Sequence, residues 1–247
     1  AMRCFSAALE AGDIKAAAPL GKLRQDACDW AGAAVAYERA LPVDPTNALL
    51  HGSLGKVYAK LGRTREAILR YAHAIQLDPT LGRLHAAFGL ALQGVGRYEE
   101  AAKAYGDALA AVAQAYAEQC EWGHNANRHT QIYEHTDLYN PAVYGMPLPE
   151  SGFYSGENIA GAWMSQGSGY VDTILTNQVD GWWSEHDLWH RQTYASNTIN
   201  GAGHFTQVGW ADTRQIGCGF AVCDDGMFPQ LNLHFLVCNY YTGGNYI

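Results

Sequence analysis

The chain has 247 residues, a formal net charge of −8 and no apolar run long enough to cross a membrane. Residues 1–115 carry 13 Lys and Arg against 11 Asp and Glu, whereas residues 116–247 carry 3 against 13. The second half is too acidic to lie along phosphates, so nucleic acid is not an expected partner. The first ten residues lack the uninterrupted apolar core of a secretory signal peptide.

A 34-residue period runs through residues 14–47, 48–81 and 82–115, which align without gaps. The three segments share Gly at position 8, Ala at position 20 and Tyr at position 24. Small residues let the two helices of a repeat approach closely, and we expect the Tyr to fill the space between neighbouring repeats. The period and these residues resemble tetratricopeptide repeats, so residues 1–115 are expected to form an all-α array of helical hairpins. The matching positions are Gly21, Gly55 and Gly89; Ala33, Ala67 and Ala101; Tyr37, Tyr71 and Tyr105.

A peptide or protein partner is the expected ligand of this repeat array. An acidic segment would complement its basic side chains, although ordinary solvated helix residues give the same charge pattern. The basic residues concerned are Lys56, Lys60, Arg63 and Arg65.

The third repeat lacks the Asp-Pro pair that ends the other two, and residues 108–119 contain no Gly or Pro. We therefore expect one long helix from about Tyr98 to Glu121 that serves both halves of the chain.

Residues 116–247 alternate Gly-rich loops with short apolar segments, which predicts an α/β domain. Residues 171–189 are expected to form a helix, and residues 205–210, 217–222 and 231–240 to form strands. The last of these strands is apolar at nearly every position, which is typical of a strand covered on both faces.

Several motifs follow one another in the second half. Together they resemble the signature of the CAP superfamily, which comprises the cysteine-rich secretory, antigen 5 and pathogenesis-related class 1 proteins. The resemblance implies a three-layer α-β-α sandwich over residues 116–247. The motifs are Cys120-Glu-Trp-Gly-His124, Gly156-Glu157-Asn158-Ile159-Ala160, Asp180-Gly-Trp-Trp-Ser-Glu185, Gly203-His204-Phe-Thr-Gln with the following residues to Gly219, Val237-Cys238-Asn239-Tyr240, and Gly244-Asn245-Tyr246.

The resemblance also implies a central cavity lined by two His and two Glu from four separate segments. Such a set would suit a divalent metal, and Zn²⁺ matches these nitrogen and oxygen ligands better than Mg²⁺ or Ca²⁺ does. Carried over motif by motif, the four residues are His124, Glu157, Glu185 and His204.

A disulfide from Cys238 to the preceding strand is a further implication of the resemblance. Its partner matches Cys223 in some branches of the family and Cys218 in the antigen 5 branch. Sequence does not fix the connectivity, and we expect the Cys223–Cys238 pairing.

One alternative to this site stays open. His186 and His190 are four residues apart on the expected helix and, with Glu185, would form a separate metal site.

The domain also departs from the family at its beginning, because the third repeat occupies the place of the family's first helix. Either this repeat helix substitutes as a packing layer, or the domain has a more open cavity.

The resemblance implies a non-enzymatic binding protein without assigned catalytic residues. The expected ligand of the CAP part is a sterol, a fatty acid or another small apolar molecule, or a protein partner. One alternative is a metal-dependent hydrolase in which Glu157 or Glu185 is the general base. The other is an interaction scaffold driven by the repeats. We expect a secreted protein, because the cysteines of the second half favour an oxidising compartment.

Overall fold

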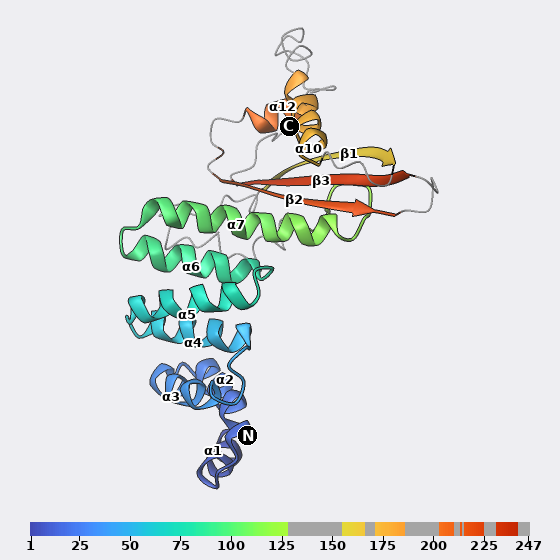
Figure 1. Ribbon diagram of the computed structural model, residues 1–247. Helices are drawn as coiled ribbons and strands as arrows, with labels where there is room; N and C mark the ends of the chain where they lie inside the picture. Colours follow the sequence, from blue (N-terminus) through green and yellow to red (C-terminus); the bar gives the residue numbers. More distant parts are fainter. Residues whose placement is uncertain are drawn as a thin grey trace. The chain divides into compact units, whose positions relative to one another are not determined.

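The computed structural model describes residues 1–127, 155–165, 171–185, 203–209, 213, 215–224 and 231–241. The chain forms two compact units, Ala1–Tyr105 and Gly106–Ile247 (Figure 1). One helix, α7, begins in the first unit and ends in the second. Within the described ranges, no helix combines the length and apolarity that a membrane span requires.

The first unit is built of consecutive helical hairpins, as the repeat period predicts (Figure 1). A short helix precedes them, and the second helix of the last hairpin continues into the second unit. The elements are α1 (Met2–Glu10), a 3-10 turn (Ile14–Ala16), α2 (Ala17–Asp26), α3 (Trp30–Ala40), α4 (Ala48–Lys60), α5 (Thr64–Leu77), α6 (Gly82–Gly94) and α7 (Tyr98–Ala117).

The repeated glycine and tyrosine meet within each hairpin. A Cβ atom on Gly21 would lie 2.6 Å from the Tyr37 ring, and one on Gly55 would lie 2.8 Å from the Tyr71 ring. The third repeat has the same contact at 2.8 Å. The tyrosine ring therefore packs on the glycine of its own repeat. The sequence predicted only that this ring fills the space between neighbouring repeats. Glycine is required there because any side chain would push the two helices apart.

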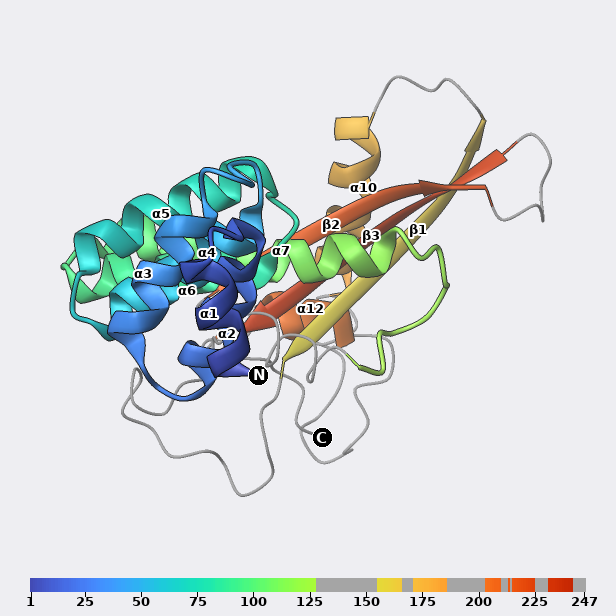
Figure 2. The same cartoon turned by 90° about the horizontal axis from the view of Figure 1, so that it is seen from below.

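The second unit contains a three-stranded antiparallel sheet with the strand order β1-β3-β2 (Figure 2). The predicted strands over residues 217–222 and 231–240 are confirmed as β2 and β3. The central strand β3 is buried along most of its length, because α7 covers one face of the sheet and α10 the other, which explains its largely apolar sequence. The elements are β1 (Gly156–Ser165), α10 (Val171–Ser184), α12 (Gly203–Val208), β2 (Gln215–Cys223) and β3 (Leu231–Tyr241).

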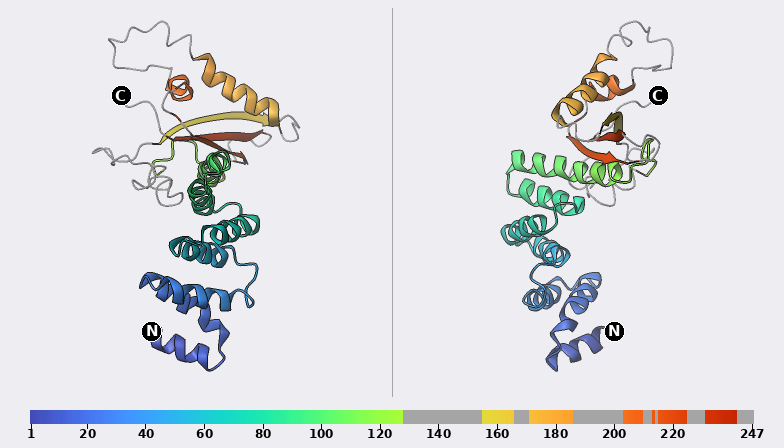
Figure 3. Two further views of the ribbon diagram at one scale, coloured as in Figure 1. Left: turned by 90° about the vertical axis from the view of Figure 1, so that its left-hand side faces the viewer. Right: turned by 45° about the vertical axis from the view of Figure 1, so that its right-hand side comes forward.

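Helices cover both faces of this sheet (Figure 3). On one face, Ala113 and Tyr116 of α7 pack against Phe235 of β3. On the other face, Trp182 of α10 packs against Leu236 of the same strand. The α-β-α layering is thus confirmed, and the C-terminal part of α7 supplies one of its layers.

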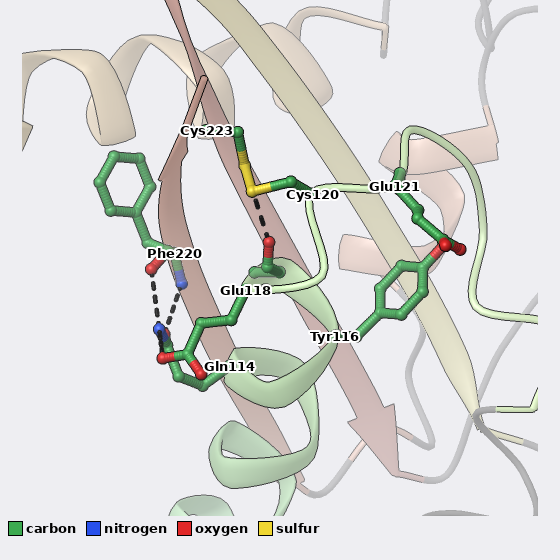
Figure 4. The surroundings of a disulfide bond; sticks show 8 residues. Gln114, Tyr116, Glu118, Cys120, Glu121, Phe220 and Cys223 are labelled. Carbon is green, nitrogen blue, oxygen red and sulfur yellow. Dashed lines mark hydrogen bonds between the residues drawn. A yellow bond between two sulfur atoms is a disulfide. The ribbon is translucent and has the colours of Figure 1, made fainter. Parts of the chain in front are cut away.

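Two glycines of β2 allow α7 to approach the strand closely. A Cβ atom on Gly217 would lie 2.1 Å from the backbone nitrogen of Ala110, and one on Gly219 would lie 2.1 Å from that of Gln114. The side-chain amide of Gln114 donates to the carbonyl oxygen of Phe220 at 3.0 Å and accepts from its backbone N–H at 2.8 Å (Figure 4). Because β2 is an edge strand, this amide takes the place that a neighbouring strand would occupy.

The predicted Cys223–Cys238 disulfide is wrong. The strand register places Cys238 opposite Cys218, and these two cysteines are bonded with a Cα–Cα distance of 4.1 Å. Cys223 instead bonds to Cys120, which follows α7, with a Cα–Cα distance of 5.6 Å (Figure 4). Cys223 is paired in register with Leu233, five residues from Cys238, so the expected bond is out of reach.

Two predicted elements differ from the structure. The segment 205–210, expected as a strand, lies mainly in helix α12. The long helix is confirmed but ends at Ala117, four residues before the expected end. The predicted helix over 171–189 is present as α10 up to Ser184, and residues 186–189 lie outside the described residues.

Candidate functional site: two histidine–glutamate pairs

The first pair joins His124 to Glu157. Glu157 is the second residue of β1, and its side chain is fully buried, whereas that of His124 is 54% exposed. Nδ1 of the histidine lies 3.0 Å from Oε1 of the glutamate, which also accepts the backbone N–H of Asn125 at 2.8 Å. The other carboxylate oxygen, Oε2, is buried and has no hydrogen-bond partner in the described part of the chain.

The second pair joins His204, in the first turn of α12, to Glu185, which follows α10. Nδ1 of His204 lies 2.7 Å from Oε1 of Glu185. Oε2 of the same carboxylate accepts the backbone N–H groups of His204 at 3.0 Å and Phe205 at 3.2 Å. The carboxylate therefore also satisfies amides that a helix start leaves unpaired, which explains why this polar segment is helical.

Polar contacts attach the second pair to the strand that carries the first. Asn158, adjacent to Glu157, donates its side-chain N–H to the carbonyl oxygen of His204 at 3.1 Å. The indole N–H of Trp182 donates to the carbonyl oxygen of Ile159 at 3.2 Å, and its ring stacks on that of His204 with centroids 6.0 Å apart. Both pairs are thus attached at the beginning of β1.

The structure brings the four predicted residues together as two pairs. Among the described residues, no group of three or more His, Cys, Asp or Glu side chains is arranged to hold a metal ion. A single cavity in which all four residues bind one metal therefore stays a prediction. The alternative ligands His186 and His190 lie outside the described residues.

The pairs define which nitrogen of each imidazole is available. An ionised carboxylate only accepts hydrogen bonds, so Nδ1 of a neutral histidine beside it carries the proton. Nε2 then has the free lone pair in both His124 and His204. This carboxylate–histidine arrangement is the one that orients imidazoles toward metals in proteins. The donor chemistry therefore fits a divalent metal held by imidazole, with the glutamates behind the ligands.

Burial affects two tyrosines near these pairs. It raises the pKa of Tyr240 to about 12, while the hydrogen bond from Asn158 lowers it. Burial also raises the pKa of Tyr116, and the nearby carboxylates of Glu157 and Glu121 raise it further. Both hydroxyls are therefore protonated at neutral pH, and Tyr116 donates its proton to the carbonyl oxygen of Gly123 at 3.0 Å.

Sequence reasoning missed Asn158 and Trp182 as residues that position the second pair. Both lie inside quoted motifs, directly after Glu157 and three residues before Glu185. Trp182 is buried, whereas Trp183 and Trp163 are 54% and 38% exposed. Trp183 and Trp163 are therefore at the surface of the CAP part, and Trp182 is in its core.

A helical layer, a three-stranded sheet, a second helical layer and paired His and Glu side chains together define a CAP domain. The sequence matches the Cysteine-rich secretory protein family over residues 101–240, and the chain belongs to this family. It also matches the tetratricopeptide repeat over residues 48–81. The family match begins inside α7, in agreement with the role of this helix as a layer of the domain. Together, the two modules support a binding or protein-interaction role.

Similar proteins include Peptidase inhibitor 16 of Mus musculus, which is 34% identical over 141 residues, covering 56% of this chain and 22% of the relative. The Venom allergen 3 homolog of Dinoponera quadriceps is 33% identical over 142 residues, covering 56% of this chain and 50% of the relative. The chain thus spans half or less of the length of these relatives. Among solved structures, a crystal structure of MamA is 30% identical, with a TM-score of 0.38. The match covers 40% of this chain and 57% of the MamA chain.

Proposed function

We propose that the chain is a non-enzymatic binding protein. Its CAP domain binds a small apolar ligand, such as a sterol or a fatty acid, and a divalent metal, preferentially Zn²⁺, at the two histidines. Its repeats bind a peptide or protein partner. The observation that carries this proposal is the state of the two glutamates: both oxygens of Glu185 accept hydrogen bonds, and the Glu157 side chain is fully buried beside His124.

A general base needs an oxygen within hydrogen-bond reach of the proton that it removes. Glu185 accepts three hydrogen bonds from His204 and Phe205, and the Glu157 side chain is fully buried. These contacts favour binding over the metal-dependent hydrolase. If the wild type has esterase or peptidase activity and the Glu185→Ala variant lacks it, the hydrolase would be preferred instead.

The metal would be held by the imidazole nitrogens that the glutamates leave free, Nε2 of His124 and His204. When bound, the ion supplies a positive charge and open coordination positions to an anionic or carbonyl group of a ligand. The chain's own contribution is orientation. Each carboxylate keeps the proton on Nδ1, and Asn158 and Trp182 hold His204 against β1.

Calorimetric titration of the metal-free protein with Zn²⁺ tests this part of the proposal. One ion per chain at this site, lost in His204→Ala and in His124→Ala, is the expected result. A His186→Ala/His190→Ala variant serves as the control, because these histidines are the ligands of the alternative site expected from the sequence. Binding that is unchanged in His124→Ala and His204→Ala, or lost in the control, would refute the assignment.

The apolar ligand is proposed to contact Trp183, whose ring is 54% exposed and packs edge-on against Phe205 with centroids 5.3 Å apart. An exposed indole offers a large apolar surface and costs little conformational entropy on binding. Titrations with a sterol and with a fatty acid should show at least tenfold weaker binding for Trp183→Ala than for the wild type. Trp122→Ala, which removes another exposed indole, is the matched control. Equal losses in the two variants would contradict the proposed position.

An acidic peptide is proposed as the partner of the repeats. Lys56, Lys60 and Arg65 are exposed, whereas the Arg63 guanidinium is held by both carboxylate oxygens of Glu66 and is less available than the sequence suggests. The double substitution Lys56→Glu/Lys60→Glu should weaken binding of an acidic peptide. The single substitution Arg63→Glu should weaken this binding less. If it weakens binding more than the double substitution does, Lys56 and Lys60 do not contact the peptide.

We further propose that the protein works outside the cell. The support is the pair of disulfides in the CAP domain, because such bonds persist in oxidising compartments. Protein from its native source should then contain two free thiols, those of Cys4 and Cys28. Six free thiols under denaturing conditions would contradict the extracellular location.

A further inference from the structure

The second repeat contains two neighbouring histidines that the proposed function does not use. His51 of α4 and His73 of α5 have ring centroids 4.4 Å apart, with their planes tilted by 60°. His51 is only 5% exposed, whereas His73 is at the surface. The pair therefore joins a buried imidazole to one that solvent reaches.

One nitrogen of the buried imidazole has no partner among the residues that the structure describes. Nε2 of His51 lies 2.9 Å from the carbonyl oxygen of Pro45. Because a carbonyl only accepts hydrogen bonds, Nε2 carries the proton and Nδ1 has the lone pair. Nδ1 is buried and has no hydrogen-bond partner within the described residues. A buried acceptor without a partner is unfavourable, so a ligand that accepts this lone pair would stabilise the repeat.

The environment also keeps this imidazole neutral. Burial lowers the pKa of His51 most; the Pro45 hydrogen bond raises it, and the charges of His73 and Arg70 lower it further. A neutral imidazole is the form that binds transition metals.

The next repeat offers an internal comparison. His85 occupies the position of His51 and makes the same contact, with Nε2 2.8 Å from the carbonyl oxygen of Pro79. His85 has a further interaction, and the residue in the place of His73 is Asp107. The unpartnered nitrogen is therefore found in the repeat whose facing residue is a second imidazole.

We propose that His51 and His73 form a transition-metal site. Nδ1 of His51 and a ring nitrogen of His73 bind one Zn²⁺ or a similar ion, and water completes the coordination. Zinc–nitrogen bonds of about 2.0–2.1 Å put each ring centre roughly 3 Å from the ion, so two rings on adjacent tetrahedral positions are about 5 Å apart. The observed 4.4 Å is within about 1 Å of this separation, so a small rotation of the exposed His73 ring would accommodate the ion. The ion would cross-link α4 to α5 and make the stability of the repeat depend on metal.

Histidine-selective ¹⁵N labelling of the full chain gives a direct test, because long-range ¹H–¹⁵N spectra distinguish the two nitrogens of each ring. On titration with Zn²⁺, the signals of His51 Nδ1 and His73 should shift together and saturate. The rings of His124 and His204 report separately on the CAP domain, so failure at either location is distinguishable from failure at the other. Unchanged signals of His51 and His73 at saturating Zn²⁺ would overturn the proposal.

A pair of variants tests the role of the exposed ligand. His73→Ala should weaken Zn²⁺ binding at His51 at least tenfold, as measured from the same signals. Arg39→Ala removes the exposed side chain at the corresponding position of the first repeat and should leave the affinity unchanged. Equal affinities in the two variants would also overturn the proposal.

Discussion

Replacing Gly219 with Ala tests the close packing of α7 on β2. The added Cβ would lie 2.1 Å from the backbone nitrogen of Gln114, whereas ordinary contact begins at 3.4 Å. The strand and helix must therefore separate by more than 1 Å. The two hydrogen bonds between Gln114 and Phe220, at 2.8 and 3.0 Å, would stretch to about 4 Å and be lost.

The expected loss of stability combines two effects. Overpacking costs about 1–3 kcal/mol, and each lost hydrogen bond costs about 1 kcal/mol net. Gly219→Ala should therefore lower the free energy of unfolding by roughly 4 kcal/mol, a large part of the 5–15 kcal/mol typical of a domain.

Urea unfolding followed by tryptophan fluorescence measures this effect, because six of the seven Trp lie in residues 116–247. Gly181→Ala is the control. Gly181 lies in α10, and beyond its own helix no atom of the described residues lies within 4 Å of an added Cβ, so this change should raise stability by about 0.5–1 kcal/mol. If the free energy of unfolding of Gly219→Ala lies within about 0.5 kcal/mol of that of the wild type, the close backbone contact is refuted.

Three further results are expected. Replacing Cys120 and Cys223 with Ser opens a loop with a sequence separation of 103 and should cost about 4–5 kcal/mol, measured by urea unfolding; a smaller loss than for the 20-residue bridge within the sheet would contradict the chain-entropy argument. Because the pKa of Tyr240 is raised to about 12 in the folded state and is about 10 in the unfolded state, the unfolded chain ionises first, and stability should fall between pH 10 and pH 12. Tyr240→Phe should reduce this fall in the urea midpoint, and identical pH profiles would exclude the effect. Residues 116–247 alone lack most of α7, including Ala113 and Gln114, which contact the sheet, and should show no cooperative unfolding, whereas residues 98–247 should retain it. A cooperative transition in the shorter chain would show that this part of α7 is dispensable.

The repeats and the strands β2 and β3 could be predicted because their determinants are local, whereas β1 was not predicted. The glycine and tyrosine that meet in each hairpin recur with a fixed period, and β3 is largely apolar because both of its faces are covered. The motifs also singled out all four residues of the two His–Glu pairs.

The errors involve contacts between distant parts of the chain. Residues 205–208 are helical partly because the amides at the start of α12 are satisfied by Glu185, 19 residues before His204. The disulfide connectivity depends on the register of β2 against β3 and on a partner, Cys120, that is 103 residues from Cys223. The pairing within the site depends in the same way on how separate segments meet, which the spacing of motifs does not specify.

The two disulfides also determine what a protease can release. The covalent rings closed by Cys120–Cys223 and Cys218–Cys238 overlap, because Cys218 precedes Cys223. Any single peptide bond cut between Cys120 and Cys238 therefore leaves the two fragments joined. A nicked CAP domain would migrate as one species on a non-reducing gel and separate only after reduction, so it would keep its repeats attached after limited digestion.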